Sequence, residues 1–324
     1  MRTINFRGPD NQIIQVQLKR RGGKNSRIVF HDDGHEEVVP NDLLDFDSLA
    51  VIDDRRVGTR IVPITPLRSF YYSVRELTGS REERFEPLKK RLQNSSDEVS
   101  AFFLAELFSR SHSHMEFFNN REEPFYKSGS RPPKTNDHFA TELVDLLSNA
   151  PPVFGDGVNF IGYVDYEINP LRTTSSCFES GEPAKSSGAG GMDLLLISGE
   201  GKNALPAIGE IKAKTEQVGP TFALIQAMTY AAELVTNHQW LRLGNYYPEA
   251  FGEICVESRT PCVDLLLILE SPVGNGDDLR FAVRLAERLL EDDRVSSSIR
   301  KIQFLKGQIN DETVSINAVD VQWA

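Results

Sequence analysis

The chain has 324 residues, and its 47 acidic residues outnumber its 36 lysines and arginines, which gives a formal net charge of −11. Such a charge excludes a protein whose whole surface is basic for nonspecific nucleic-acid binding, although a local basic groove is compatible with it. Hydrophobic residues make up 40% and charged residues 26%, as in ordinary globular proteins, and the length predicts about two domains.

Cysteine usage and hydropathy predict a cytoplasmic protein without a membrane partner. Cys177, Cys255 and Cys262 show no CxxC spacing and cannot all pair, which favours a reducing compartment and no zinc site. The first twenty residues contain no apolar signal segment. The longest apolar runs, at 194–197 and 263–269, are too short to span a bilayer.

Residues 1–75 are predicted to form mostly strands and turns. Short or alternating apolar runs at 13–18, 27–30 and 60–64 favour a small β-sheet or barrel. The basic turn at 19–24 is open to two interpretations, a phosphate contact or a solvated hairpin tip, and the second is favoured.

Residues 80–118 predict two helices. Ser95 and Glu98 stand at capping-box spacing before the second helix. Its aromatic-rich face indicates core packing in preference to a dimer contact.

A linker is expected at 119–136, where three prolines, a Gly-Ser tract and many charges occur together. The domain boundary is placed near Lys134. This divides the chain into a β-rich and helical recognition or regulatory module at 1–134 and a second domain at 135–324.

The second domain alternates helices and strands, which predicts an α/β fold. The long polar loop at 172–191 is expected to close over a substrate as a lid. The strand at 263–270 is expected to run parallel to the one before it. The predicted elements are helix 137–150, strands 159–168, 193–198 and 205–214, helix 220–236, strand 263–270, helix 278–292, and strands 299–305 and 313–319.

The stretch 191–230 carries the candidate chemistry. Asp193 opens one apolar strand, and Glu210 and Lys212 close the next. Alternate residues of a strand share a face, so Glu210 and Lys212 point the same way and Ile211 points the opposite way. If the two strands pair, Asp193 can lie beside Glu210.

The helix that follows adds an amide and a phenol. Gln226 and Tyr230 are four residues apart and share one helical face. Two carboxylates and a backbone carbonyl suit Mg²⁺, which prefers oxygen ligands. A lysine beside the metal can orient or deprotonate water and stabilise charge on a phosphate. The pattern therefore predicts metal-assisted hydrolysis of a phosphodiester.

These motifs resemble the PD-(D/E)xK nuclease superfamily. Asp193 followed by Glu210-Ile211-Lys212 looks like its D…(D/E)xK signature. Gly191-Met192-Asp193 and Gln226-Ala-Met-Thr-Tyr230 resemble the GxD and QxxxY boxes of its RecB-like branch. The resemblance covers residues 136–270, and Met192 stands where the family has a proline.

A second ExK triplet, Glu200-Gly201-Lys202, lies in a Gly-flanked turn and is rejected as a site. The resemblance implies a restriction-endonuclease-like fold, with a mixed central sheet flanked by helices. It also implies that Asp165 and Glu167, on the first strand, lie outside the site. For Glu142, on the first helix, a metal-site role and a solvent-facing role are weighted equally.

The resemblance also implies a role for each site residue. Mg²⁺, with Mn²⁺ as a substitute, is held by Asp193, Glu210 and the carbonyl of Ile211. Lys212 activates water, with Lys214 as its backup. Gln226 and Tyr230 orient water, Lys212 or the nucleic-acid backbone.

The expected activity is therefore cleavage of DNA in prokaryotic defence, restriction or DNA processing. A protein partner or a second copy is expected to bind through the N-terminal module. The alternative is a catalytically inactive or ligand-gated nuclease fold that serves as a DNA- or protein-binding scaffold.

Overall fold

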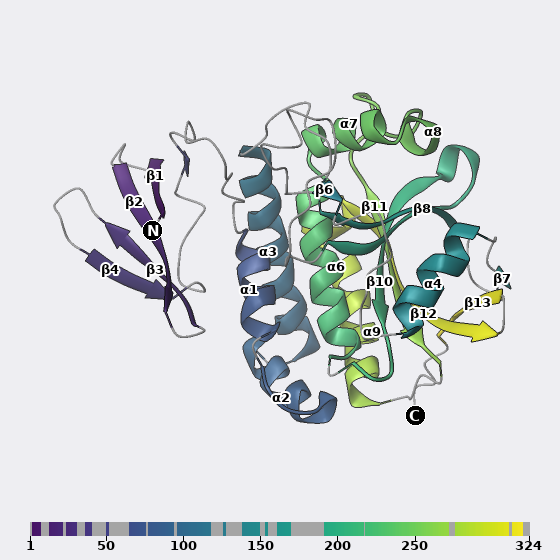
Figure 1. The fold of residues 1–324 in the computed structure, drawn as a ribbon, viewed down its shortest axis with the longest axis horizontal. Coiled ribbons are helices and arrows are strands. Elements are labelled where there is room, and N and C mark those ends of the chain that lie inside the picture. The colour runs from purple at the N-terminus through teal and green to yellow at the C-terminus, as the bar shows by residue number, and fades with distance from the viewer. Residues whose placement is uncertain are drawn as a thin grey trace.

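The computed structural model describes the larger part of the chain (Figure 1). Only the backbone is described for the strands within 2–51 and for the short strands at 126–127 and 153–154. Side chains are described for most residues of 65–117, 139–149, 162–168, 191–271, 276–310 and 313–319.

A mixed sheet of eight described strands forms the centre of the molecule, with a two-residue strand at each edge (Figure 1). β9 is antiparallel to both of its neighbours, β8 and β10, whereas β10, β11 and β12 run parallel to one another. The expected mixed sheet, with the strand near 263–270 parallel to its predecessor, is confirmed. Across the sheet the order is β6 (Tyr126–Lys127), β8 (Ile161–Asn169), β9 (Met192–Ser198), β10 (Leu205–Lys212), β11 (Val263–Glu270), β12 (Ile299–Asn310), β13 (Thr313–Ala318) and β7 (Val153–Phe154).

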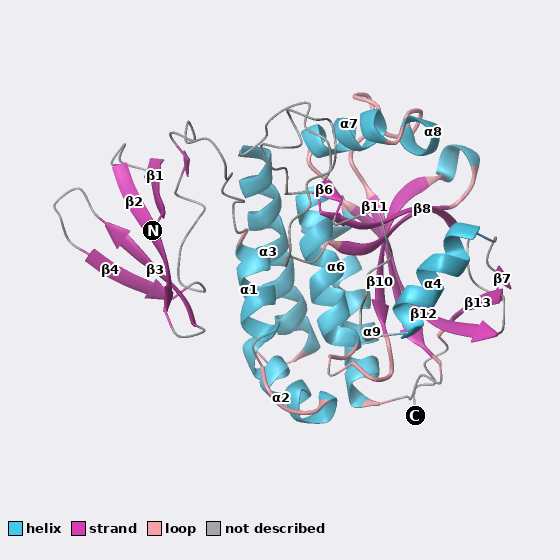
Figure 2. Ribbon diagram, in the orientation of Figure 1, coloured by secondary structure: helices cyan, strands magenta, loops and turns pink. Residues whose placement is uncertain are grey.

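Helices cover both faces of this sheet (Figure 2). Side chains alternate along β11, so Leu265 and Leu267 join one core cluster while Leu266 and Ile268 join the other. Among the residues with described side chains, α4 (His138–Asn149) is the one helix that contributes to the second cluster. The first cluster is built by α1 (Pro66–Arg75), α2 (Arg81–Arg91), α3 (Asp97–Phe117), α6 (Pro220–Leu234), α7 (Asn237–Tyr246), α8 (Pro248–Phe251), α9 (Asp277–Leu290) and α10 (Asp293–Ser296).

Helix α6 is the centre of the first layer, and every one of its 15 residues is buried. It packs between the strands β10 and β11 on one side and the helices α1, α3 and α9 on the other. A helix that is surrounded in this way needs no polar face, which explains its apolar composition. Within the described residues, no helix is long and apolar enough to cross a membrane.

Helix α1 corrects the expectation that residues up to 75 form strands and turns. Pro66 stands at the first helical position, and the Thr65 hydroxyl accepts a hydrogen bond from the backbone N–H of Arg68. The buried residues Leu67, Tyr71 and Val74 recur at helical spacing. The aromatic and β-branched residues of this segment favour strands intrinsically, and packing against α3 and α6 overrides that preference.

The expected helices at 80–118 are confirmed as α2 and α3, and Ser95, the predicted cap of α3, lies outside the described residues. At the start of α3 the Ser96 hydroxyl accepts a hydrogen bond from the backbone N–H of Val99. A complete capping box begins α2, where Ser80 and Glu83 each accept from the other's backbone N–H.

The N-terminal segment contains a separate antiparallel sheet, as the short apolar runs predict. Its order is β4 (Glu36–Pro40), β3 (Lys24–Phe30), β2 (Ile13–Arg21), β1 (Arg2–Arg7) and β5 (Ala50–Val51). The strand expected at 60–64 and the boundary expected near Lys134 lie outside the described residues. Helices α1 to α3, which precede that boundary, share a continuous core with α6 and α9.

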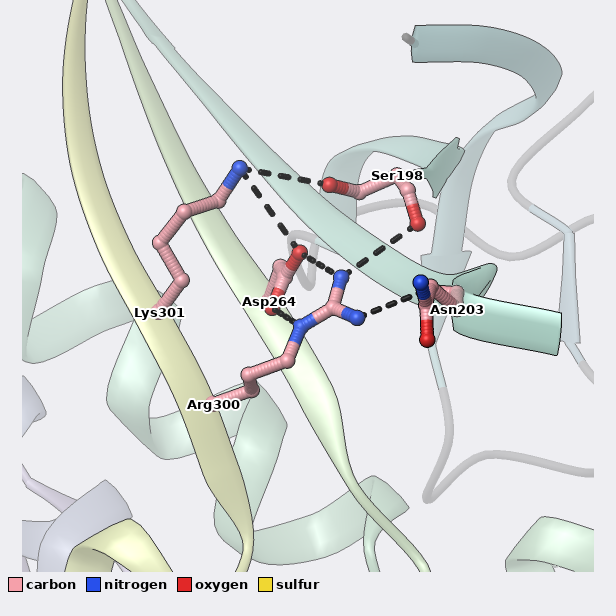
Figure 3. A network of polar contacts seen from close by, with 5 residues as sticks. All are labelled: Ser198, Asn203, Asp264, Arg300 and Lys301. Atoms are coloured by element: carbon pink, nitrogen blue, oxygen red, sulfur yellow. Dashed lines mark hydrogen bonds and ion pairs between the residues drawn. The ribbon is translucent and has the colours of Figure 1, made fainter. Parts of the chain in front are cut away.

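An ion cluster around the buried Asp264 fastens the sheet on the α4 side of β11 (Figure 3). The Arg300 guanidinium donates to both carboxylate oxygens of the fully buried Asp264, at 3.0 and 2.6 Å. Lys301 also reaches Asp264, at 3.8 Å, and the Ser198 hydroxyl, at 3.4 Å. The register shifts between Val263 and Asp264, and such a bulge lets two consecutive basic residues face one acid. The cluster joins β9, β11 and β12.

Candidate functional site

The pairing of β9 with β10 brings the two predicted carboxylates together. Gly209 stands opposite Leu194, and one further step in this antiparallel register puts Glu210 opposite Asp193. Directly opposite residues of two antiparallel strands lie on the same side of the sheet. The backbone N–H of Ile211 donates to the Asp193 carboxylate at 2.8 Å, which fixes that side chain against β10. Both acids face α6.

Glu210 is the electrostatic centre of the site. Its side chain is fully buried, and its pKa is raised well above the usual value by burial and then by the nearby charge of Asp193. Lys212 opposes this shift by donating to Glu210 Oε1 at 2.7 Å. The second oxygen, Oε2, is buried and accepts no hydrogen bond from a donor among the described residues, and Asp193 is close enough for the two acids to share a hydrogen bond when one of them is protonated. A buried carboxylate oxygen without a donor is costly unless a proton, a cation or water binds it.

The ammonium of Lys212 is held in its charged form. Burial lowers its pKa, but the carboxylates of Glu210 and Asp193 more than reverse that effect, and the net shift is upward. Glu216 adds a further negative charge at 3.5 Å from the Lys212 nitrogen. Lys212 is therefore a fixed positive charge and hydrogen-bond donor next to the two acids.

Helices α6 and α1 form the wall of the site. Tyr230 is buried, and burial raises the pKa of its phenol, with Glu210 and Asp193 among the charges that act on it. Gln226 lies one turn earlier on α6 and is also buried. From α1, Tyr71 reaches the same region, and burial followed by the charge of Glu210 raises its pKa to about 12. Both phenols stay protonated and can donate hydrogen bonds.

A buried ion pair attaches α1 to α6. Arg68 donates to both carboxylate oxygens of Glu233, and the two side chains are 4% and 0% exposed. The Arg68 guanidinium also lies over the Tyr230 ring, 5.2 Å from its centroid. A sequence pattern centred on 191–230 gives no sign that a helix near residue 70 contributes to the site.

Glu167 lies next to Asp193, which corrects the expectation that it is outside the site. Tyr166 pairs with Leu194 and Ile168 pairs with Met192, so Glu167 stands opposite Asp193. Burial and the charge of Asp193 both raise the pKa of Glu167.

The other acid of β8, Asp165, is bound elsewhere. Its carboxylate accepts hydrogen bonds from the Tyr247 hydroxyl at 2.9 Å and from the backbone N–H of Tyr166 at 2.8 Å.

Two further predicted residues lie elsewhere. Glu142 is exposed on α4, the helix on the opposite face of the sheet from Glu210, and its metal-site role stays a prediction. Lys214 is 59% exposed and pairs with Glu270 at 3.0 Å, so it is directed away from the acids. The predicted lid lies outside the described residues, apart from Gly191.

A pocket of about 420 Å³ opens at the carboxyl ends of β10 and β11, and Lys212 lies in its wall. Ligands of α/β proteins commonly bind at this end of parallel strands. Arg81 and Phe85 of α2 form one side of the pocket, and Asp277 and Asp278 at the start of α9 form another. The lysine therefore borders a cavity that opens to solvent, whereas Glu210 is not among the residues that line it.

The donor set fits a divalent cation, although it is incomplete. Within the part of the chain that has described coordinates, no three His, Cys, Asp or Glu side chains are gathered closely enough to hold a metal ion together. Two carboxylates, the unpartnered Oε2 of Glu210 and a nearby backbone carbonyl suit a cation such as Mg²⁺ that keeps several waters. The carbonyl of Ile211 is expected on the Asp193 side because the N–H of the same residue points there.

Comparison with models of protein families, with curated proteins and with solved structures found no match to this chain.

Proposed function

We propose that this protein is a Mg²⁺-dependent nuclease that hydrolyses phosphodiester bonds of DNA. The observation that carries the proposal is the arrangement of Asp193, Glu210 and Lys212 on one face of the sheet, with a buried Glu210 oxygen that has no described partner. Two acids in like-charge contact and a fixed ammonium form a site for a cation and a phosphate. The resemblance of the DxₙExK and QxxxY boxes supports the same chemistry.

The residues divide the work of hydrolysis among them. Asp193, Glu210 and the Ile211 carbonyl would hold the cation, which supplies charge stabilisation and lowers the pKa of bound water. Lys212, being charged, donates a hydrogen bond to the phosphate or to the attacking water and does not remove a proton. Water adds to phosphorus, the bond to the leaving oxygen breaks, and the leaving oxygen gains a proton as the water loses one. Tyr230 and Gln226 orient Lys212 or the water.

A gated form of this enzyme is the second candidate, and the position of helix α1 over the site favours it. Tyr71 of α1 lies near Glu210, Arg68 of α1 pairs with Glu233 over the Tyr230 ring, and Glu210 is fully buried. DNA reaches such a centre only if α1 moves or if the strand enters through the pocket beside Lys212. A ligand or partner that displaces α1 would then switch the nuclease on.

Cleavage of plasmid and linear DNA tests the proposal. Wild type, Glu210→Ala and Lys212→Ala are incubated with Mg²⁺, with Mn²⁺ or with chelator. Wild type is expected to cut only with metal, and each substitution is expected to reduce the cleavage rate about 10²-fold or more. Nicking of circles indicates an endonuclease, and digestion of linear DNA alone indicates an exonuclease.

The second ExK triplet provides a matched control. Glu200 and Lys202 have the same spacing as Glu210 and Lys212, but they are exposed in a turn. Glu200→Ala and Lys202→Ala should cut as wild type does. Equal cleavage by all five proteins would indicate a contaminating nuclease. Wild type that neither cuts DNA nor binds metal would refute the proposal.

A further inference from the structure

Three carboxylates form a row across the sheet, one on each of three adjacent strands. The register places Glu167 of β8 opposite Asp193 of β9, and Asp193 opposite Glu210 of β10. Like charges at opposite positions of antiparallel strands repel, and the pKa of Glu167 is raised by burial and then by the charge of Asp193. The next position in the row, on β11, is Leu267, which carries no charge. A row of three acids in a largely buried face therefore calls for a counter-charge.

The backbone at Glu167 is held in an unfavourable conformation. Its φ is +49°, in the left-handed region that side chains other than glycine rarely adopt. Such strain persists where the surrounding structure determines it, and it concentrates at functional sites. Glycine would relieve the strain at this position, yet the chain carries a carboxylate there.

Gly191 allows this conformation to form. A Cβ on Gly191 would lie 2.7 Å from the carbonyl oxygen of Ile168 and 2.8 Å from the carbonyl carbon of Glu167. The glycine that opens the Gly-x-Asp box therefore lets the strand with Asp193 approach the backbone of Glu167. The left-handed backbone at Glu167 and the close approach at Gly191 thus both act on the pair of side chains Glu167 and Asp193.

We propose that Glu167 is a positioning residue of the cation site, where its carboxylate holds a water molecule bound to the cation of Asp193 and Glu210. The inference rests on the proposed metal-dependent function. A role through water agrees with the preference of Mg²⁺ for retaining several waters. The buried Glu210 oxygen without a described partner is the independent sign that a ligand belongs in this row.

Mn²⁺ binding without DNA tests the role of Glu167. Isothermal titration and metal-dependent thermal shift compare wild type with Glu167→Gln, Glu167→Asp, Glu167→Gly and Asp193→Asn. Residues that orient a metal's ligands or waters change metal affinity by roughly 10–100-fold when mutated, and Glu167→Gln should weaken Mn²⁺ binding by that factor. Glu167→Asp should recover part of the loss, and Asp193→Asn should abolish binding.

The glycine variant separates a positioning role from a structural one. Glu167→Gly should raise the melting temperature of the metal-free protein, because strain is relieved, and still weaken Mn²⁺ binding as much as Glu167→Gln does. Glu200→Gln, in the exposed turn, is the control and should change neither quantity.

Two failures are distinguishable. If Glu167→Gln binds Mn²⁺ with wild-type affinity while Asp193→Asn does not bind it, the role of Glu167 is wrong and the proposed function stands. If wild type binds no Mn²⁺ and cuts no DNA, both proposals fail together.

Discussion

The ion pair between Arg68 and Glu233 is predicted to hold α1 against α6, and breaking it tests how the site is covered. Both side chains are almost fully buried, at 4% and 0% exposure. Arg68→Met removes one charge and leaves Glu233 buried without its guanidinium. Removing one partner of a buried pair costs about 3–5 kcal/mol of the free energy of unfolding. For a chain of 324 residues the corresponding fall in melting temperature is roughly 4–7 °C.

A double-mutant cycle isolates the pair from the rest of the packing. Arg68→Met and Glu233→Met are measured singly and together by urea denaturation. The double variant should recover most of the stability lost by either single variant, because a buried ion pair and an apolar pair of similar volume have similar stability. A loss below about 1 kcal/mol in Arg68→Met, the value typical of exposed pairs, would refute the argument.

Three further outcomes follow from the described contacts. Asp193→Asn removes the like charge beside Glu210, so the metal-free protein should gain about 1 kcal/mol of stability by thermal denaturation; a loss would contradict the repulsion. The Cys255 thiol, buried and with a pKa raised to about 12 by burial, should react with a thiol reagent at pH 8 only after unfolding, as absorbance would show. Asp264→Ala should cost about 1–3 kcal/mol in urea denaturation by freeing Arg300, yet leave Mn²⁺ affinity unchanged, since Asp264 lies on the other face of the sheet.

Much of the second half of the fold could be predicted because its signals are local. The strands at 192–198, 205–212 and 263–270 are continuous apolar runs, and α6 begins at a proline after a glycine. Alternation along β10 correctly put Glu210 and Lys212 on one side, and pairing of β9 with β10 brought Asp193 next to them. Each of these inferences needs only neighbours in sequence and one strand pairing.

The rest of the site depends on contacts between distant segments. Tyr71 lies near Glu210 and Arg68 lies over Tyr230 because α1 packs across α6, and nothing in the composition of 66–75 indicates that contact. Glu167 joins Asp193 through the register of β8, which is irregular between Tyr163 and Asp165. A shift of one residue would put Glu167 on the opposite face, so its position could not be derived from spacing alone.

A bound cation would offset each of the energetic costs within this site. Glu210 is buried beside another carboxylate, and one of its oxygens lacks a described partner. Glu167 adds a third acid and a strained backbone. Lys212 supplies one positive charge to a row of three acids, and its hydrogen bond goes to Oε1 of Glu210 and not to Oε2. Packing alone would be better served by apolar residues in these positions, as it is at Leu267 in the same row. Under the proposed function a divalent ion would complete the arrangement, so metal binding, more than DNA cleavage, is the property to measure first.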